Sequence, residues 1–166
     1  MMTFICSVCG GEHSELPALA LFRPDHWLSF SPEQQLEGEL TSDWCMTPDG
    51  HYFVRCSLLL PIDGAPDRTF AFGVWSSLSE DNFKHYVLAF NDKGQSKLGN
   101  MFGWLSNELP GDFAGSLHLK CQVWPQDDRQ RPLIELEPTD HPLARAQREG
   151  ISFEYAQRLA HEHGAI

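Results

Sequence analysis

The chain has 166 residues, 42% of them hydrophobic, and its 23 acidic against 12 basic residues give a formal net charge of −11. A chain this long and this apolar buries a substantial core, which excludes a disordered protein and predicts one domain over residues 1–166. The acidic excess repels polyanions, so we expect no nucleic-acid or membrane partner, whereas binding to another protein is allowed.

The sequence predicts a cytoplasmic protein. Its N-terminus has neither a basic region nor a long apolar stretch, so no secretory signal is expected. Runs such as Leu58–Leu60 and Val87–Phe90 are far too short to span a membrane. Five cysteines, an odd number, suit a reducing compartment better than a set of disulfides.

The opening of the chain, residues 1–16, predicts a turn that resembles a zinc knuckle. A short strand over Thr3–Val8 leads into the C-x-x-C-G motif of Cys6 and Cys9, and His13 follows closely. Two thiolates and one imidazole at this spacing are typical ligands of tetrahedral zinc. Cys45 is our preferred fourth ligand, because it follows a polar stretch near a turn.

Two other interpretations of this motif stay open. The two thiols could be unligated, or they could form a redox dithiol, which is expected at the start of a helix in a βαβ unit. The Gly10-Gly11 pair begins a helix poorly. Cys56 and Cys121 alternate with apolar residues, so we expect them to be buried as small hydrophobic side chains.

The middle of the chain predicts two central strands. Ser31-Pro32-Glu33 begins a short helix that runs to about Glu37. After the Asp49-Gly50 turn, alternation predicts a strand over His51–Leu60, and a Pro/Gly/Asp loop leads to a second strand over Arg68–Ser76. We expect the two strands to be antiparallel neighbours at the centre of the sheet. Their expected core residues are Tyr52, Val54, Phe70 and Phe72.

The rest of the chain mixes helices with further strands. A helix begins at Ser79, with its apolar residues spaced three and four apart, and ends at Gly94. Turns rather than regular helices join most strands, which favours an α+β fold with a mostly antiparallel sheet and helices packed on one face. Further strands are expected over residues 101–108, 117–123 and 132–137, and helices over 139–149 and from 152 onward.

A polar run in the C-terminal third contains the weak catalytic candidates Glu135, Glu137, Asp140 and His141. The two glutamates share one face of a strand, and with the Asp-His pair they could bind a metal or transfer protons. The alternative interpretation is structural, with Thr139 or Asp140 capping the following helix. That interpretation leaves His141 unexplained.

Two aromatic and histidine features carry less information. Trp75, Trp104 and Trp124 would make a ligand or partner patch if exposed together, although strand aromatics are more often part of the core. His161-Glu162-His163 lies at a terminus and lacks the spacing that places two histidines on one helix face.

Several segments are distinctive: GVWSSLS at 73–79, GWLSN at 103–107, LPG at 109–111, RPLIELEPTDHPLA at 131–144 and QREGI at 147–151. These segments, which span nearly the whole chain, resemble a bacterial family, domain of unknown function 2199. The resemblance implies a cytosolic, single-domain bacterial protein that opens with a Cys/His segment like Cys6–His13. It brings no activity with it.

Two functions follow from these observations. The first is a non-enzymatic protein-interaction module with an acidic, aromatic surface and a structural zinc ion. The second is a small enzyme built on the Glu/Asp/His residues of the C-terminal third.

Overall fold

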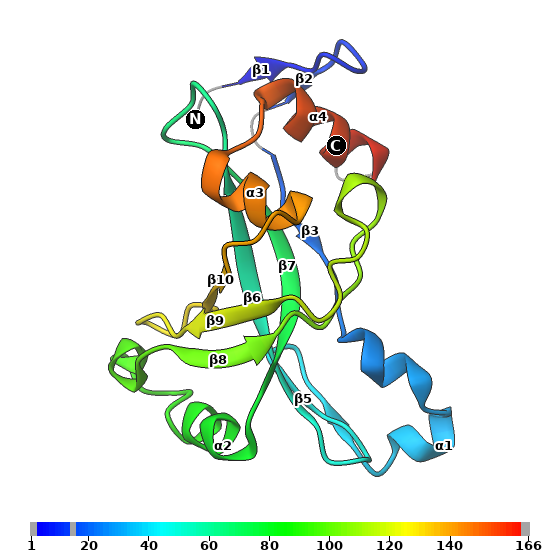
Figure 1. Cartoon of the computed structure of the whole chain (residues 1–166), viewed down its shortest axis with the longest axis vertical. Helices are drawn as coiled ribbons and strands as arrows, with labels where there is room; N and C mark the ends of the chain where they lie inside the picture. The colour runs from blue at the N-terminus through cyan, green and yellow to red at the C-terminus, as the bar shows by residue number, and fades with distance from the viewer. Residues whose placement is uncertain (1–2, 14–15, 164–166) are drawn as a thin grey trace.

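The computed structural model describes residues 3–13 and 16–163 (Figure 1). Its centre is a long antiparallel pair, β6 (Tyr52–Pro61) and β7 (Thr69–Leu78), matched in register from one end to the other. The two predicted central strands and their direction are therefore confirmed. Val54, Phe70 and Phe72 are buried, and Tyr52 is half-buried against the ring of Phe83.

The main sheet is mixed, so the prediction of a mostly antiparallel sheet is wrong. Its strand order is β3-β7-β6-β10-β9-β8, and β3 runs parallel to β7 and β10 parallel to β6. Turn signals predict antiparallel pairing only between consecutive strands, whereas both parallel pairs join strands that are distant in the sequence. The remaining strands are β3 (Leu19–Ala20), β4 (Glu39–Leu40), β5 (Trp44–Met46), β8 (Met101–Trp104), β9 (Lys120–Trp124) and β10 (Leu133–Leu136).

The sheet curls until β8 meets β7 again. An antiparallel bridge joins Ser76 to Leu105, and the backbone N–H of Ser106 donates to the carbonyl of Trp75 at 2.8 Å. A side chain at Gly103 would collide with Ser76 and Ser77, so glycine is required where β8 crosses β7. The curl brings residues 104–106 beside the start of β6, which shapes the cavity described below.

Most helices cover one face of the sheet. Ser79 and Ser152 cap α2 (Glu80–Leu88) and α4 (Phe153–Glu162) as N-terminal residues, and His141 caps α3 (Pro142–Glu149). Buried residues of these three helices join the main core cluster, together with Val54, Cys56, Leu58 and Leu60 of β6. The short helix α1 (Pro32–Gln35) begins with a Ser31 capping box. The 3-10 segments are η1 (Asp25–Ser29), η2 (Gln95–Leu98) and η3 (Gly111–Phe113).

A second, smaller core lies on the opposite face of β6. It contains Trp27 of η1, Cys45 of β5, Phe53 and Trp75. Trp75 is fully buried, and its indole N–H donates to the carbonyl of Leu21 at 2.9 Å. This cluster fixes η1 beside the start of β6.

No helix in the described part of the chain is long and apolar enough to cross a membrane.

Two predicted strands are shorter than expected. The strand predicted over residues 101–108 ends at Trp104. The strand predicted over residues 117–123 begins at Lys120, because His118 has a φ of 72°, which an extended strand does not allow.

Candidate metal centre

A small separate hairpin carries the Cys/His motif. Strands β1 (Phe4–Ile5) and β2 (Glu12–His13) pair antiparallel at one end of the molecule (Figure 1). Between them Gly10 adopts a φ of 74°, and its N–H donates to the carbonyl of Cys6 at 2.9 Å. The turn therefore depends on a glycine conformation directly after Cys9, which bends the chain back toward His13 of β2.

The turn brings Cys6, Cys9 and His13 together, with their ligand atoms all within 4.8 Å of one another. The Cys9 Sγ and His13 Nε2 atoms lie 3.6 Å apart. Tetrahedral zinc with bonds of about 2.3 Å to sulfur and about 2.0 Å to nitrogen requires a separation of about 3.6 Å. The three predicted residues thus lie close enough together to ligate one metal ion, and the separation of Cys9 and His13 fits tetrahedral zinc.

Backbone N–H groups point at both sulfur atoms. Val8 N–H lies 3.4 Å from the Cys6 Sγ, and Gly11 N–H lies 3.4 Å from the Cys9 Sγ. Hydrogen bonding, chiefly from the backbone of Cys9, outweighs burial and lowers the pKa of Cys6 below its ordinary value. Such donors favour the thiolate form, which is the form that binds metals.

The hairpin is attached to α4. The N–H of Ser7 donates to Gln157 Oε1 at 2.7 Å, and the rings of Phe4 and Phe153 meet edge to face at 5.0 Å. The Arg68 guanidinium lies 4.9 Å from the centre of the Phe153 ring and 5.4 Å from that of Phe4. The position of the two thiols is therefore coupled to the packing of the last helix.

Cys45, the expected fourth ligand, lies elsewhere, and the structure does not bring it to this group. It is buried in the second core, in strand β5, which Figure 1 shows at the end of the molecule opposite the hairpin. Burial, aided by the charge of Glu39, raises the pKa of the Cys45 thiol to about 12. The polar stretch before Cys45 forms the turn between β4 and β5 and does not bring Cys45 to the metal-ligand group.

The four C-terminal candidates do not form one cluster. Glu135 and Glu137 are exposed, and Asp140 is exposed on the approach to α3. His141 is itself the N-cap: its Nδ1 accepts from the N–H of Leu143 at 3.0 Å, and its Nε2 donates to the carbonyl of Ala114 at 3.0 Å. The structural interpretation expected Thr139 or Asp140 in this role. Thr139 instead accepts from the N–H of His141.

Two of the three tryptophans are exposed. Trp75 is core, whereas Trp104 and Trp124 are each 41% exposed. With Phe102 they lie on one shared face of β8 and β9, because side chains alternate along a strand and Phe102 pairs with Gln122 and Trp104 with Lys120. We call Phe102, Trp104 and Trp124 the aromatic face.

A second group of metal-ligand residues was missed by the sequence interpretation. His26, Asp49 and His51 also hold their ligand atoms within 4.8 Å of one another. His26 is 23 residues from its partner, and only the fold joins them. The local signal was the Asp-x-His spacing at the Asp49-Gly50 turn, which had been interpreted only as a hairpin turn.

Comparison with known proteins identifies a family of this chain. A family described as uncharacterised proteins conserved in bacteria, DUF2199, matches residues 5–151. No curated protein and no solved structure matches the chain. The match ends before α4 and includes both groups of ligand residues.

Proposed function

This chain belongs to the DUF2199 family of uncharacterised bacterial proteins, and we propose its function from the residues of its candidate sites. The protein is a non-enzymatic protein-interaction module whose N-terminal hairpin is held by a structural zinc ion. The observation that carries the zinc assignment is the 3.6 Å separation of Cys9 Sγ and His13 Nε2, with Cys6 completing the group. All five cysteines are free thiols, which supports a reducing, cytoplasmic location.

Zinc has a structural role in this proposal because the hairpin is small. Strands β1 and β2 contain two residues each, and two-stranded hairpins are at best marginally stable in water. A metal that links the turn to His13 of β2 fixes the hairpin against α4. The fourth tetrahedral position is filled by water or by a donor outside the three described ligands.

The aromatic face supplies the partner surface of the proposal. Edge-to-face packing at 5.4 Å fixes the rings of Phe102 and Trp104 against each other while leaving both partly exposed. Aromatic side chains held in this way lose little conformational freedom on binding, which is why they are enriched at interfaces. The exposed Glu135 and Glu137 beside them favour a partner with basic residues around an apolar centre.

Metal analysis tests the zinc assignment. We expect Cys9→Ser to lose one equivalent of zinc per chain, because it removes a ligand from an exposed position. Cys45→Ala is the matched control and should keep the full zinc content. In cobalt-substituted protein, the thiolate-to-metal absorption should disappear in Cys9→Ser and persist in Cys45→Ala. Equal zinc content in wild type and Cys9→Ser would overturn the assignment.

Partner binding is tested separately. Proteins recovered on the immobilised wild-type chain are identified, purified and titrated against wild type, against Phe102→Ser with Trp124→Ser, and against Leu88→Ser. Leu88 is the control because it is an apolar residue, 83% exposed, on α2 and not on the strands that carry the aromatic face. We expect the double variant to weaken binding at least tenfold and the control to leave it unchanged. A partner that binds all three proteins equally would refute this interface.

A further inference from the structure

His26, Asp49 and His51 converge from separate segments. One carboxylate oxygen of Asp49, Oδ2, lies 2.8 Å from His26 Nε2, and the other, Oδ1, lies 3.1 Å from His51 Nδ1. Tetrahedral zinc bound by nitrogen and oxygen at about 2.0 Å requires a ligand separation of about 3.3 Å. The two imidazole–carboxylate separations lie within about 0.5 Å of that value, and all three ligand atoms lie within 4.8 Å of one another, so the group can admit a metal ion by side-chain movement.

Buried residues position His26 and Asp49. His26 precedes Trp27, which is 8% exposed, and the His26 ring packs on Phe53 at 6.2 Å between centroids. Thr47 is buried in the turn, and its hydroxyl donates to Asp49 Oδ1 at 2.5 Å. Hydrogen bonds of this kind orient the ligands of metal sites, so the group is held by more than its mutual contacts.

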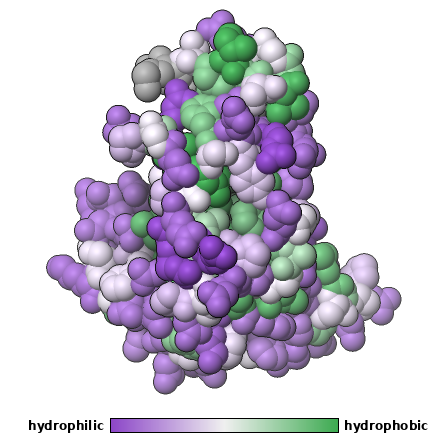
Figure 2. All heavy atoms as spheres, turned by 45° about the horizontal axis from the view of Figure 1, so that its top comes forward, coloured by the Kyte–Doolittle hydropathy of each residue, from purple (hydrophilic) through white to green (hydrophobic). Residues whose placement is uncertain are grey.

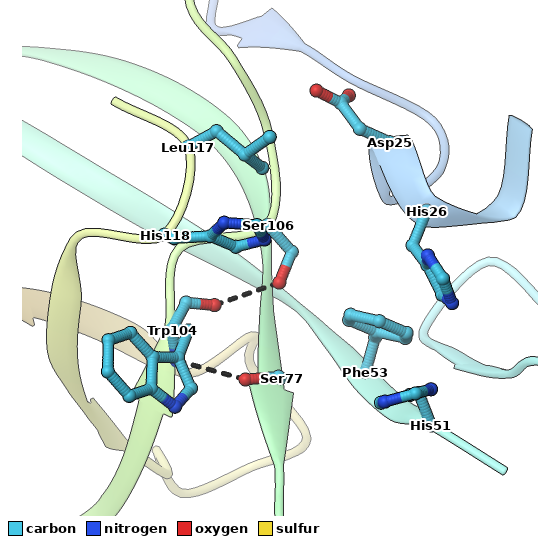
Figure 3. Close-up of a pocket in the computed structure, with 9 residues that line it drawn as sticks. All are labelled: Asp25, His26, His51, Phe53, Ser77, Trp104, Ser106, Leu117 and His118. Atoms are coloured by element: carbon cyan, nitrogen blue, oxygen red, sulfur yellow. Dashed lines mark hydrogen bonds between the residues drawn. The ribbon is translucent and has the colours of Figure 1, made fainter. Parts of the chain in front are cut away.

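A cavity of about 470 Å³ adjoins the group. Figure 3 shows His26, His51 and Phe53 on one side of it and Trp104 and His118 on the other. Its volume lies within the usual range for small-molecule sites, and its wall combines aromatic rings with a few polar groups. A metal bound by His26 and His51 would be placed at the edge of this space.

His118 supplies a second, independent observation. Its φ of 72° is uncommon for a residue other than glycine. The backbone is held there by a 2.7 Å hydrogen bond from the His118 N–H to the carbonyl of Leu105. The strain places a third imidazole on the cavity wall, and strained residues concentrate at binding sites.

We propose that His26, Asp49 and His51 bind a divalent transition-metal ion, with remaining coordination positions for a small organic ligand that carries an oxygen donor. Two histidines and one carboxylate are a common ligand set for catalytic zinc and for non-haem iron, in which open positions receive substrate or water. The apolar part of such a ligand would rest on Trp104 and Leu117, and His118 would hydrogen-bond its polar end. This site does not depend on the hairpin zinc.

The experiment uses the full chain carrying Cys9→Ser, so that the hairpin site does not contribute. Zinc is titrated by calorimetry into this protein and into versions that add His51→Ala, Asp49→Asn or, as the control, His85→Ala on α2. We expect one equivalent to bind, His85→Ala to leave binding unchanged, and the other two to weaken it at least tenfold. Because the His51 side chain is 60% exposed, His51→Ala retains the fold even if Asp49→Asn disturbs the turn.

Cobalt then separates this site from the hairpin. Cobalt in the Cys9→Ser chain should give visible absorption without the thiolate-to-metal band, and acetohydroxamate, a probe with two oxygen donors, should change that absorption. Trp104→Ala should weaken the binding of acetohydroxamate without releasing the metal. The proposal is overturned if no equivalent of zinc binds, if His51→Ala binds as tightly as the control, or if the probe leaves the spectrum unchanged.

Discussion

The imidazole of His141 connects two segments of backbone. Its Nδ1 accepts from the N–H of Leu143, and its Nε2 donates to the carbonyl of Ala114. This pattern fixes the neutral tautomer with hydrogen on Nε2, since a carbonyl can only accept. A side chain used in this way stabilises α3 and the preceding loop.

We therefore expect His141→Ala to lower the free energy of unfolding by about 1 kcal/mol, the usual effect of losing an N-cap. His141→Asn should retain most of the stability, because asparagine also caps helices. Urea unfolding monitored by circular dichroism measures both. If His141 had a catalytic role and no capping role, His141→Ala would leave the free energy of unfolding unchanged. That result would contradict the capping role.

At the scale of elements, the hairpin and α4 form one unit. Figure 2 views the molecule with the hairpin end turned forward and shows hydrophobic side chains there among polar ones. Ile5 and Val8, on either side of Cys6, are 65% and 46% exposed. A hairpin with so much apolar surface in water gains little from burial, so its order depends on its contacts with α4 and, in our proposal, on the bound zinc.

Removal of zinc with a chelator should therefore increase amide hydrogen exchange at Ser7, Val8 and Gly11, whose N–H groups bond to Gln157 or to the thiols. Amides of β6 should keep their protection, because the main core does not include the hairpin turn. Mass spectrometry of peptic fragments resolves the two regions. Uniform deprotection of the whole chain would contradict this local role.

The loop after β8 has its own anchor. The Glu108 carboxylate accepts hydrogen bonds from the N–H of Gly115 at 3.0 Å and of Leu117 at 3.1 Å. The bond from Gly115, followed by that from Leu117, lowers the pKa of Glu108 below its ordinary value. A carboxylate with a lowered pKa stabilises the folded state above its unfolded pKa of about 4.3 and loses that contribution as pH falls.

We expect Glu108→Gln to be less stable than wild type near neutral pH and the difference to shrink as pH falls below about 4.3. Urea unfolding of both proteins between neutral and acid pH measures it. The glutamine side chain keeps the shape of Glu108 but removes the charge and replaces one acceptor oxygen with an NH2 donor, so a difference independent of pH would point to the lost hydrogen bond rather than to ionisation.

At the scale of the whole molecule, one core connects the sheet with α2, α3 and α4. We expect unfolding to be a single cooperative transition, as in most small domains. Tryptophan fluorescence and far-ultraviolet circular dichroism should give the same urea midpoint, because the second core, which holds Trp75, and the main core, which holds the helices, lie on the two faces of the same strands, β6 and β7. Separated midpoints would show that the chain folds in more than one unit.

How well the sequence predicts the fold and the candidate sites depends on how far apart the interacting residues are along the chain. Alternation identified β6 and β7, and spacing identified Cys6, Cys9 and His13, because these signals lie within a few residues. The parallel pair of β10 with β6 was missed, since local patterns do not determine which distant strands become neighbours. Cys45 was misplaced for the same reason.

The His26 group shows this limit most clearly at a site. Asp49 and His51 lie in one turn, but His26 reaches them only because Trp27 is buried against Phe53 and Trp75. The burial of Trp27 thus positions the neighbouring His26 side chain, although the sequence around His26 does not indicate a site. His118 was missed because a positive φ is visible only in three dimensions.

The return of β8 onto β7 has a consequence for how the protein behaves at high concentration. Open sheet edges expose unpaired backbone groups and recruit other chains into aggregates. Here both long strands are paired on each side: β6 by β7 and β10, and β7 by β6 with β3 and the residues after β8. The flanking strands among the described residues are short, with β3 containing two residues. The curl that encloses the cavity beside His26 and His51 thus also leaves few backbone edges on the outside for another copy to extend.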